Sequence, residues 1–305
     1  MNKKKSLPTY SLVEFQAEYG TDMQCREYLF ESKFPNGFVC EKCNNHDYFF
    51  IKRHKVYQCR QCNKQHSVTA GTIFENTKLS LNIWFLAMYL VSQQTTGISA
   101  TTLQKLTGVR KYDTAWNMLH KIRKVMGNRD DGYTLEGLIE FDDCYFGGNA
   151  EGKRGRGASN KSSVVVAVSK TDEGKPKYIS MKQTNDIKTD TIDEAMHTKI
   201  DKEKSTLETD GLPSLLALKK KGYTIKKTVI GDPKKASEIF KWVHTAISNA
   251  KATLEGVCHG VSKKYLQLYL DEFCYKFNRR YFGVNLFKRL LIASCEPLVV
   301  RRNEL

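Results

Sequence analysis

The sequence has no apolar run long enough to cross a lipid bilayer. One of its most apolar stretches, residues 83–91, is far shorter than the roughly 20 residues that a membrane-spanning helix needs. The N-terminal segment starts with basic residues but has no apolar core and no small-residue cleavage site, so it is not a secretory signal. It also has no long internal repeat. These absences exclude a membrane-spanning protein and a repeat array, and we expect a cytoplasmic protein.

Acidic residues are in short supply relative to basic ones. The 305 residues include 49 Lys and Arg but only 33 Asp and Glu, which gives a formal net charge of +16. An excess of this size predicts a polyanionic partner. Because no segment spans a membrane, nucleic acid is the partner that the charge favours. The length suggests roughly two domains.

Nine cysteines in an unsecreted chain indicate metal binding rather than a disulfide framework, because a reducing compartment keeps thiols free. Residues 48–51 and 56–57 are aromatic and β-branched and suit the short strands of a zinc ribbon. The alternative to a zinc site is four unrelated buried thiols, but two C-x2-C pairs separated by 15 residues argue against it. We expect His46, His54 and His66 on the surface or facing DNA. Four cysteines have the C-x2-C-x15-C-x2-C spacing of a tetrahedral structural Zn²⁺ site: Cys40, Cys43, Cys59 and Cys62.

The middle of the chain has the pattern of a helix-turn-helix. Apolar residues predict helices at about 99–106 and 112–126, with a turn around Gly108. In such a motif the second helix enters the major groove. The alternative is an ordinary helical hairpin with a solvated basic face. The predicted DNA contacts are Lys111, Thr114, Asn117, Lys121 and Arg123, and the predicted packed side is Leu103, Leu106, Val109, Ala115, Leu119 and Ile122.

After residue 132 the pattern becomes that of strands. Alternating or continuous apolar residues predict strands at 138–146, 163–169 and 177–181. Helices and strands then alternate, at about 188–199, 205–209, 213–221, 224–230 and 234–251. This order indicates a mixed α/β sheet covered by helices. The Gly- and Arg-rich connector at 147–161 is predicted to be a mobile or DNA-facing loop.

Two aspartates on predicted strands are candidates for phosphodiester chemistry. That chemistry commonly uses two divalent ions about 4 Å apart, which need converging carboxylates. Asp142 lies within the first strand, and Asp210 directly follows the strand at 205–209. Asp143 points to the opposite face from Asp142, because side chains alternate along a strand. A lone strand aspartate is more often a surface or capping residue, so the pairing carries the prediction.

Several blocks of sequence, in order, resemble the ISXO2-like insertion-sequence transposases. The resemblance runs from the cysteine pairs to about residue 290. It rests on residues 139–148 (IEFDDCYFGG), 209–212 (TDGL), 242–249 (WVHTAISN), 259–262 (HGVS) and 269–280 (YLDEFCYKFNRR).

This resemblance implies a ribonuclease-H-like core that binds Mg²⁺ or Mn²⁺. It places the metal ligands on Asp142, Asp210 and Asn249, with Lys251 as an accompanying catalytic residue. Many members of the superfamily have Glu at the third position. An amide oxygen still coordinates a metal, with less charge. The chain is therefore either an active variant with Asn or a decayed copy, and its uninterrupted motifs favour activity.

The C-terminal third interleaves basic and aromatic residues. Aromatics at helical spacing predict core packing, and we expect Arg279 and Arg280 to contact DNA phosphates. His244 and His259 either orient substrate or metal-bound water, or serve a structural role.

The sequence thus predicts an α/β fold, namely a ribonuclease-H-like mixed-sheet catalytic core preceded by a zinc ribbon and a helix-turn-helix-like helical segment. The expected function is a bacterial, nucleoid-associated transposase that binds inverted-repeat DNA ends and catalyses metal-dependent cleavage and strand transfer, as a homo-oligomer. The alternatives are a non-catalytic zinc-ribbon DNA-binding protein derived from a transposase and a nuclease that does not join strands. The expected domains are a helical lead-in at 1–36, the zinc ribbon at 37–78, the DNA-binding segment at 79–128 and the catalytic domain at 133–295.

Overall fold

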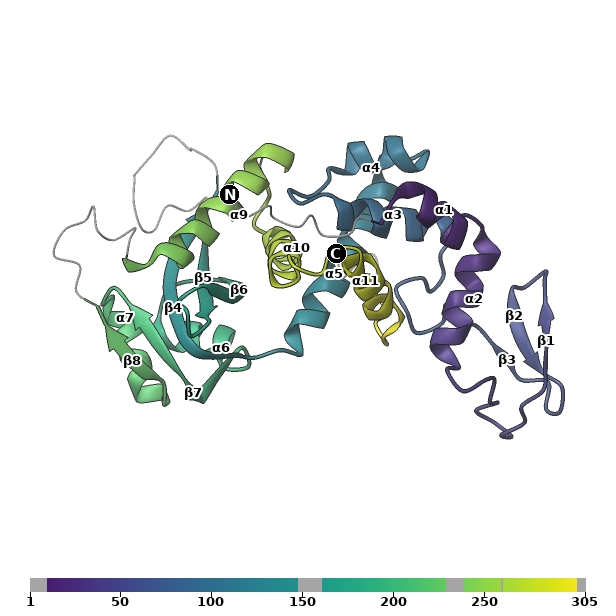
Figure 1. Ribbon diagram of the computed structural model, residues 1–305, viewed down its shortest axis with the longest axis horizontal. Coiled ribbons are helices and arrows are strands. Elements are labelled where there is room, and N and C mark those ends of the chain that lie inside the picture. Colours follow the sequence, from purple (N-terminus) through teal and green to yellow (C-terminus); the bar gives the residue numbers. More distant parts are fainter. Residues whose placement is uncertain (1–9, 148–160, 229–238, 259, 301–305) are drawn as a thin grey trace. The chain divides into compact units, whose positions relative to one another are not determined.

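The chain forms two compact units. A computed structural model describes residues 10–147, 161–228, 239–258 and 260–300 (Figure 1). One unit, here called the helical unit, comprises Met1–Gln94, Ala100–Val125 and Tyr281–Leu305, and the other, the sheet unit, comprises Thr95–Ser99 and Met126–Arg280. Of the connector predicted at 147–161, residues 148–160 lie outside the described residues. His259 also lies outside them.

The cysteine-bearing part of the helical unit is a small antiparallel sheet. Its strands are β1 (Tyr48–Ile51), β2 (Val56–Cys59) and β3 (Gln65–His66), in the order β1-β2-β3. Aromatic side chains join this sheet to the preceding helix, with the ring of Phe30 4.3 Å from that of Tyr57. The β-prone residues between the cysteine pairs therefore form the predicted strands.

Four helices of the helical unit share an aromatic core. They are α1 (Leu12–Tyr19), α2 (Asp22–Lys33), α3 (Leu81–Gln93) and α11 (Asn285–Cys295). Capping boxes at Ser11 and Thr21 start the first two helices. Ring contacts bring Phe287 of α11 against Tyr89 of α3, 198 residues earlier in the sequence, and against Phe15 of α1, 272 residues earlier. Tyr10 and Tyr19 join the same aromatic cluster.

The two helices predicted on either side of Gly108 are α4 (Ala100–Thr107) and α5 (Tyr112–Asp131). Gly108 has φ +69° in the turn between them, a conformation that favours glycine. Leu103, Ala115 and Ile122 are buried as predicted. Leu106 is 52% exposed, so its assignment to the packed side was wrong: it lies one turn beyond the buried Leu103, at the C-terminal end of this short helix.

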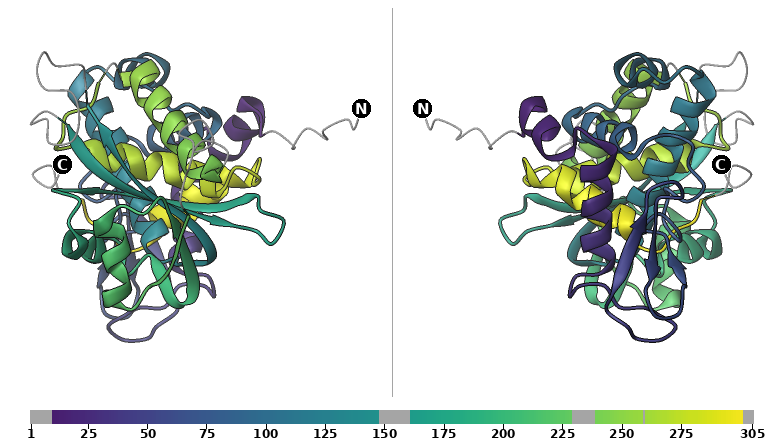
Figure 2. Two further views of the ribbon diagram at one scale, coloured as in Figure 1. Left: turned by 90° about the vertical axis from the view of Figure 1, so that its left-hand side faces the viewer. Right: turned by 90° about the vertical axis from the view of Figure 1, so that its right-hand side faces the viewer.

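The sheet unit is built on five strands. They are β4 (Leu135–Phe146), β5 (Ser162–Lys170), β6 (Pro176–Thr184), β7 (Ile200–Thr209) and β8 (Thr224–Lys227), arranged in the order β6-β5-β4-β7-β8. Strand β4 pairs with β5 antiparallel and with β7 parallel. The side views show the twist of this sheet (Figure 2). The central position of β4 brings the ends of β4 and β7 together.

Helices cover both faces of this sheet. One face, here called the α9 face, packs against α9 (Lys241–Cys258) and α10 (Leu266–Asn278) through Phe146, Val166 and Met181. The other face packs against α6 (Thr189–Met196), α7 (Pro213–Leu216) and the 3-10 turn η1 (Ala217–Lys221). This is the predicted ribonuclease-H-like α/β fold behind a zinc ribbon and a helix-turn-helix-like segment. None of the helices in the described ranges combines the length and apolar character that a membrane span requires.

Candidate active site and metal centre

Asp142 and Asp210 lie on the α9 face at neighbouring parallel strands. Glu140 of β4 is in register with Glu208 of β7. Asp142 lies two residues further along β4, and Asp210 is the residue that directly follows the end of β7. Burial and the carboxylates of Asp210 and Asp143 raise the pKa of Asp142 to about 6, although a hydrogen bond from the Asp143 N–H (2.8 Å) opposes the rise. Asp210 is exposed, and its Oδ1 accepts a hydrogen bond from the N–H of Leu212 at 3.1 Å. The topology thus brings the predicted pair into electrostatic contact.

Helix α9 presents His244 to this pair. The Nε2 atom of His244 lies 3.3 Å from Oδ2 of Asp142. Lys251, seven residues later, lies on the same side of the helix, because seven residues make about two turns. Its ammonium group is 5.7 Å from the centre of the Phe146 ring, beyond Asp142 on β4.

Asn249 lies elsewhere on α9. It is five residues from His244, which corresponds to about 140° around the helix, and its side chain is exposed. No hydrogen bond joins Asn249 to either aspartate among the described contacts. The sequence left His244 between a role in orienting substrate or metal-bound water and a structural role, although its seven-residue spacing to Lys251 was a signal in the sequence.

The donor chemistry of the pair fits a divalent cation. Carboxylate oxygens suit Mg²⁺ or Mn²⁺, whereas an additional neutral imidazole ligand suits a transition metal such as Mn²⁺ better than Mg²⁺. Asp143 faces the other side of the sheet, as alternation predicts. Among the described residues, one group of three or more His, Cys, Asp or Glu side chains has all its ligand atoms within 4.8 Å of one another, and it consists of the four cysteines. The ligand atoms at the carboxylate site are therefore more widely spaced than those of the ribbon.

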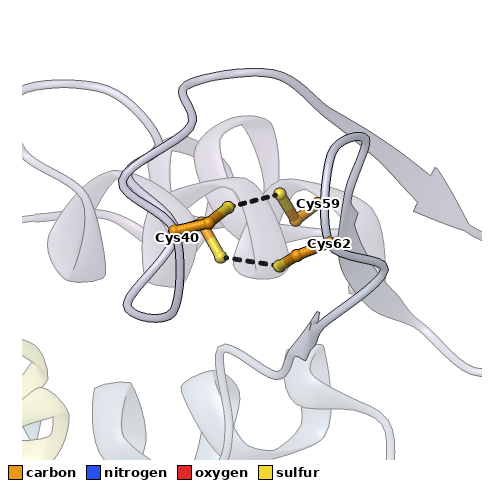
Figure 3. Close-up of side chains that lie close together, drawn as sticks. Cys40, Cys59 and Cys62 are labelled. Atoms are coloured by element: carbon orange, nitrogen blue, oxygen red, sulfur yellow. Dashed lines mark hydrogen bonds between the residues drawn. The ribbon is translucent and has the colours of Figure 1, made fainter.

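The four predicted cysteine ligands converge in the ribbon (Figure 3). The Sγ atoms of Cys40 and Cys62, and those of Cys43 and Cys59, are 3.5 Å apart. Each C-x2-C pair is followed by an asparagine with positive φ, Asn44 at +56° and Asn63 at +58°. The N–H of each asparagine bonds the carbonyl of the first cysteine in its pair. Two matching turns thus aim four thiols at one point, an arrangement that could hold zinc.

Polar groups around Cys59 favour the thiolate form that a metal requires, whereas at Cys43 the backbone N–H of Asn45 is outweighed by burial and the three neighbouring thiols, which raise its pKa to about 12. Burial tends to raise the pKa of Cys59, but backbone N–H groups of Cys62 and Gln61 and the side chain of Asn45 outweigh it and lower the pKa to about 6. The Nε2 atom of His66 lies 3.4 Å from Sγ of Cys40, and this histidine is buried. The expectation that His66 lies on the surface or faces DNA was therefore wrong, because β3 carries it inward behind the thiols.

The residues predicted to contact DNA from α5 have different exposures. Lys111 is exposed, and Thr114 and Asn117 are half-buried. Lys121 is half-buried, and its Nζ approaches the carbonyl of Ile73 at 3.5 Å. Arg123 is only 2% exposed. Arg123 thus lies inside the helical unit and not on the surface where a DNA contact was predicted.

Arg279 and Arg280 bind other parts of the sheet unit. Arg279 is buried, and its Nη1 is 2.6 Å from Oδ1 of Asp130. Arg280 donates hydrogen bonds to the carbonyls of Pro176 (2.5 Å), Lys177 (3.2 Å) and Phe277 (2.8 Å). Their donors therefore attach the end of α10 to its neighbours, and the phosphate contact stays a prediction.

Fold and site together define a class of protein: a ribonuclease-H-like domain with paired aspartates on adjacent strands, joined to a zinc ribbon. Residues 134–278 match the ISXO2-like transposase domain, and residues 20–65 match the transposase zinc-ribbon domain. The chain therefore carries both domains of an ISXO2-like insertion-sequence transposase, and the resemblance seen in the sequence is confirmed.

A curated relative has the same association with a mobile element. The chain is 23% identical, over 165 aligned positions, to a protein of Halobacterium salinarum described as an uncharacterized protein in transposable element ISH50. The match covers 49% of this chain and 52% of that relative. The chain therefore spans about half the length of this relative.

Proposed function

We propose that this protein binds the inverted-repeat ends of an insertion sequence and catalyses DNA cleavage and strand transfer. The observation that carries the proposal is the proximity of Asp142 on β4 and Asp210 at the end of the adjacent parallel strand β7, close enough for the Asp210 carboxylate to raise the pKa of Asp142, within a transposase domain. A cation bound there would supply positive charge to polarise the scissile phosphate. The two carboxylates would hold that cation, and the rigid strands would keep them in place.

We assign the third position of this site to His244 in preference to Asn249. His244 approaches Asp142 within 3.3 Å, whereas Asn249 lies on another side of α9. In this arrangement Lys251 lies on the same side as His244 and is available to bind a phosphate near the reacting strand. The paired variants His244→Ala and Asn249→Ala test the choice. We expect loss of cleavage for His244→Ala only, and the reverse result would restore Asn249 as the third ligand.

The DNA-binding part of the proposal concerns the helical unit. We propose that the four cysteines hold structural Zn²⁺ and that exposed polar residues of α5, chiefly Lys111 with Thr114 and Asn117, contact the DNA ends. A homo-oligomer is expected because transposition acts on two DNA ends at once.

A strand-transfer assay on end-sequence DNA tests the function. In Mg²⁺ or Mn²⁺ we expect nicking and joined products, which Asp142→Asn or Asp210→Asn abolishes while DNA binding persists. Asp143→Asn is the matched control, because it removes the same charge one residue away on the opposite face. We expect it to retain activity within roughly tenfold, a difference of about 1.4 kcal/mol in barrier. Undiminished cleavage by the Asp142 variant would refute the site.

The same assay separates the alternatives. A non-catalytic DNA-binding protein derived from a transposase would protect end DNA without metal-dependent strand breaks. A simple nuclease would give nicks and no joined product.

A further inference from the structure

Two rows of carboxylates cross the α9 face of the sheet, one row beyond the other. Glu140 and Glu208 form the first row, since they are register partners on β4 and β7. Asp142, two residues further along β4, and Asp210, which directly follows the end of β7, form the second row. The proposed metal site uses only the two aspartates, so the two glutamates have another role.

The first row is neutralised from within the fold. The Nζ atom of Lys170 lies 3.5 Å from Oε1 of Glu140 and 2.5 Å from Oε2 of Glu208. Lys226 adds a second ammonium group, 2.8 Å from Oε1 of Glu208. Two lysines thus balance two glutamates. The described contacts of the second row are instead His244 and backbone N–H groups.

Glu140 has a further contact that Glu208 lacks. Its Oε2 accepts hydrogen bonds from the backbone N–H groups of Trp242 (2.8 Å) and Val243 (2.9 Å), in the first turn of α9. These N–H groups have no acceptor within the helix, and the positive end of the helix dipole favours a carboxylate there. Glu140 is 2% exposed, so water does not compete for these bonds.

This contact joins the two elements that carry the proposed site. Glu140 is two residues before Asp142 on β4, and Val243 directly precedes His244 on α9. One buried side chain therefore sets how the start of α9 lies against the strand. If that contact is lost, the helix can shift or rotate while both the strand and the helix remain intact.

We infer that Glu140 is a positioning residue that holds α9 in register with β4, so that the α9 donor stays beside Asp142; this rests on the function proposed above. Glu140 does not touch the reacting groups itself, because its two oxygens are occupied by Lys170 and by α9. Its contribution passes through the helix. Glu208 neutralises the same lysine but makes no described contact with α9, which makes it a matched control.

The first measurement is amide hydrogen exchange in peptides that cover Trp242 and Val243, on the full zinc-loaded chain. We expect Glu140→Ala to exchange roughly tenfold faster there, the size of effect that loss of a helix N-terminal acceptor produces. Glu140→Gln keeps an acceptor oxygen and should stay close to wild type. Glu208→Gln should also leave α9 unchanged. Equal exchange in all variants would overturn the inference.

The second measurement is the Mn²⁺ concentration for half-saturation, followed by electron paramagnetic resonance, alongside the concentration for half-maximal cleavage. A positioning role predicts that both rise several-fold in Glu140→Ala, that Glu140→Gln largely restores them, and that Glu208→Gln does not move them. A general loss of stability would lower the active fraction without moving either midpoint, and that result would overturn the inference. So would an equal rise in the Glu208 variant.

Failure of the proposed function is distinguishable. If the proposed function is wrong, the zinc-loaded wild type will neither bind Mn²⁺ at the aspartates nor cleave DNA. That result would refute the positioning role as well. Failure of the inference alone shows only in the comparison among variants of an active protein.

Discussion

Replacing Arg279 with Met separates a structural role for this residue from the DNA contact that the sequence predicts. The guanidinium is 2.6 Å from Asp130, with side chains 8% and 16% exposed, and it stacks 3.7 Å from the centre of the Tyr275 ring. Removing one partner of a buried ion pair costs about 3–5 kcal/mol. Asn278 still donates to Asp130 at 3.0 Å, so we expect a loss near the lower end, about 3 kcal/mol in the free energy of unfolding.

The loss should depend on pH. Burial raises the pKa of Asp130 above its ordinary value, and the Arg279 guanidinium opposes that rise. Without Arg279 the pKa in the folded state rises further, so the folded variant binds a proton more readily than the unfolded chain does. Stability of the variant therefore increases as pH falls through that pKa. The deficit relative to wild type should be larger at pH 8 than at pH 5.

Urea unfolding at both pH values measures the deficit, and DNA binding over a salt series measures any phosphate contact. For a domain of about this size, a loss of 3 kcal/mol corresponds to a fall of roughly 6–12 °C in Tm. Asp130→Asn and the double variant complete a cycle that isolates the pair. A stability change below about 1 kcal/mol, together with a salt slope reduced by about one, would show that Arg279 instead neutralises a phosphate.

Three further predictions concern Cys59 in the zinc ribbon, Gly211 next to Asp210, and Asp22, which connects α2 to the start of α3. Cys59→Ser should lower zinc content below the wild-type value and remove exchange protection from β1 and β2 but not from β4, as metal analysis and hydrogen exchange would show; retained protection would contradict a structural metal. Gly211→Ala should cost about 1–2 kcal/mol, measured by urea unfolding, because Gly211 has φ +99°, where a side chain is strained. Asp22→Asn should destabilise the protein by about 1–2 kcal/mol near pH 7, since Asp22 accepts the N–H of Leu81 at 2.7 Å and pairs with Lys55 at 3.1 Å. Although burial opposes them, these contacts lower the pKa of Asp22. Its contribution to the free energy of unfolding should therefore be present above the ordinary aspartate pKa and vanish as pH falls through the lower pKa of the folded state. A stability difference between variant and wild type that does not change with pH would refute this account.

The order and type of the main elements were predictable because they depend on local patterns. The strand predicted at 163–169 is β5, and the helices predicted at 99–106 and 112–126 correspond to α4 and α5. Alternation along β4 correctly separated the faces of Asp142 and Asp143. The start of α9 was less accessible, since its first N–H groups bond Glu140, about 100 residues earlier in the chain.

The sequence alone determined what short-range spacing controls. Two C-x2-C turns place their thiols through bonds within a few residues, so the convergence of the four cysteines at one candidate metal site was predictable without a fold. The tertiary structure decided which partner each side chain meets. Arg279 and Arg123 are basic residues of the kind that contacts DNA, but both are buried. On α9 it is His244, not Asn249, that lies beside Asp142. A helical pattern states which residues share a side of α9, but only packing against β4 selects the side that faces the carboxylates.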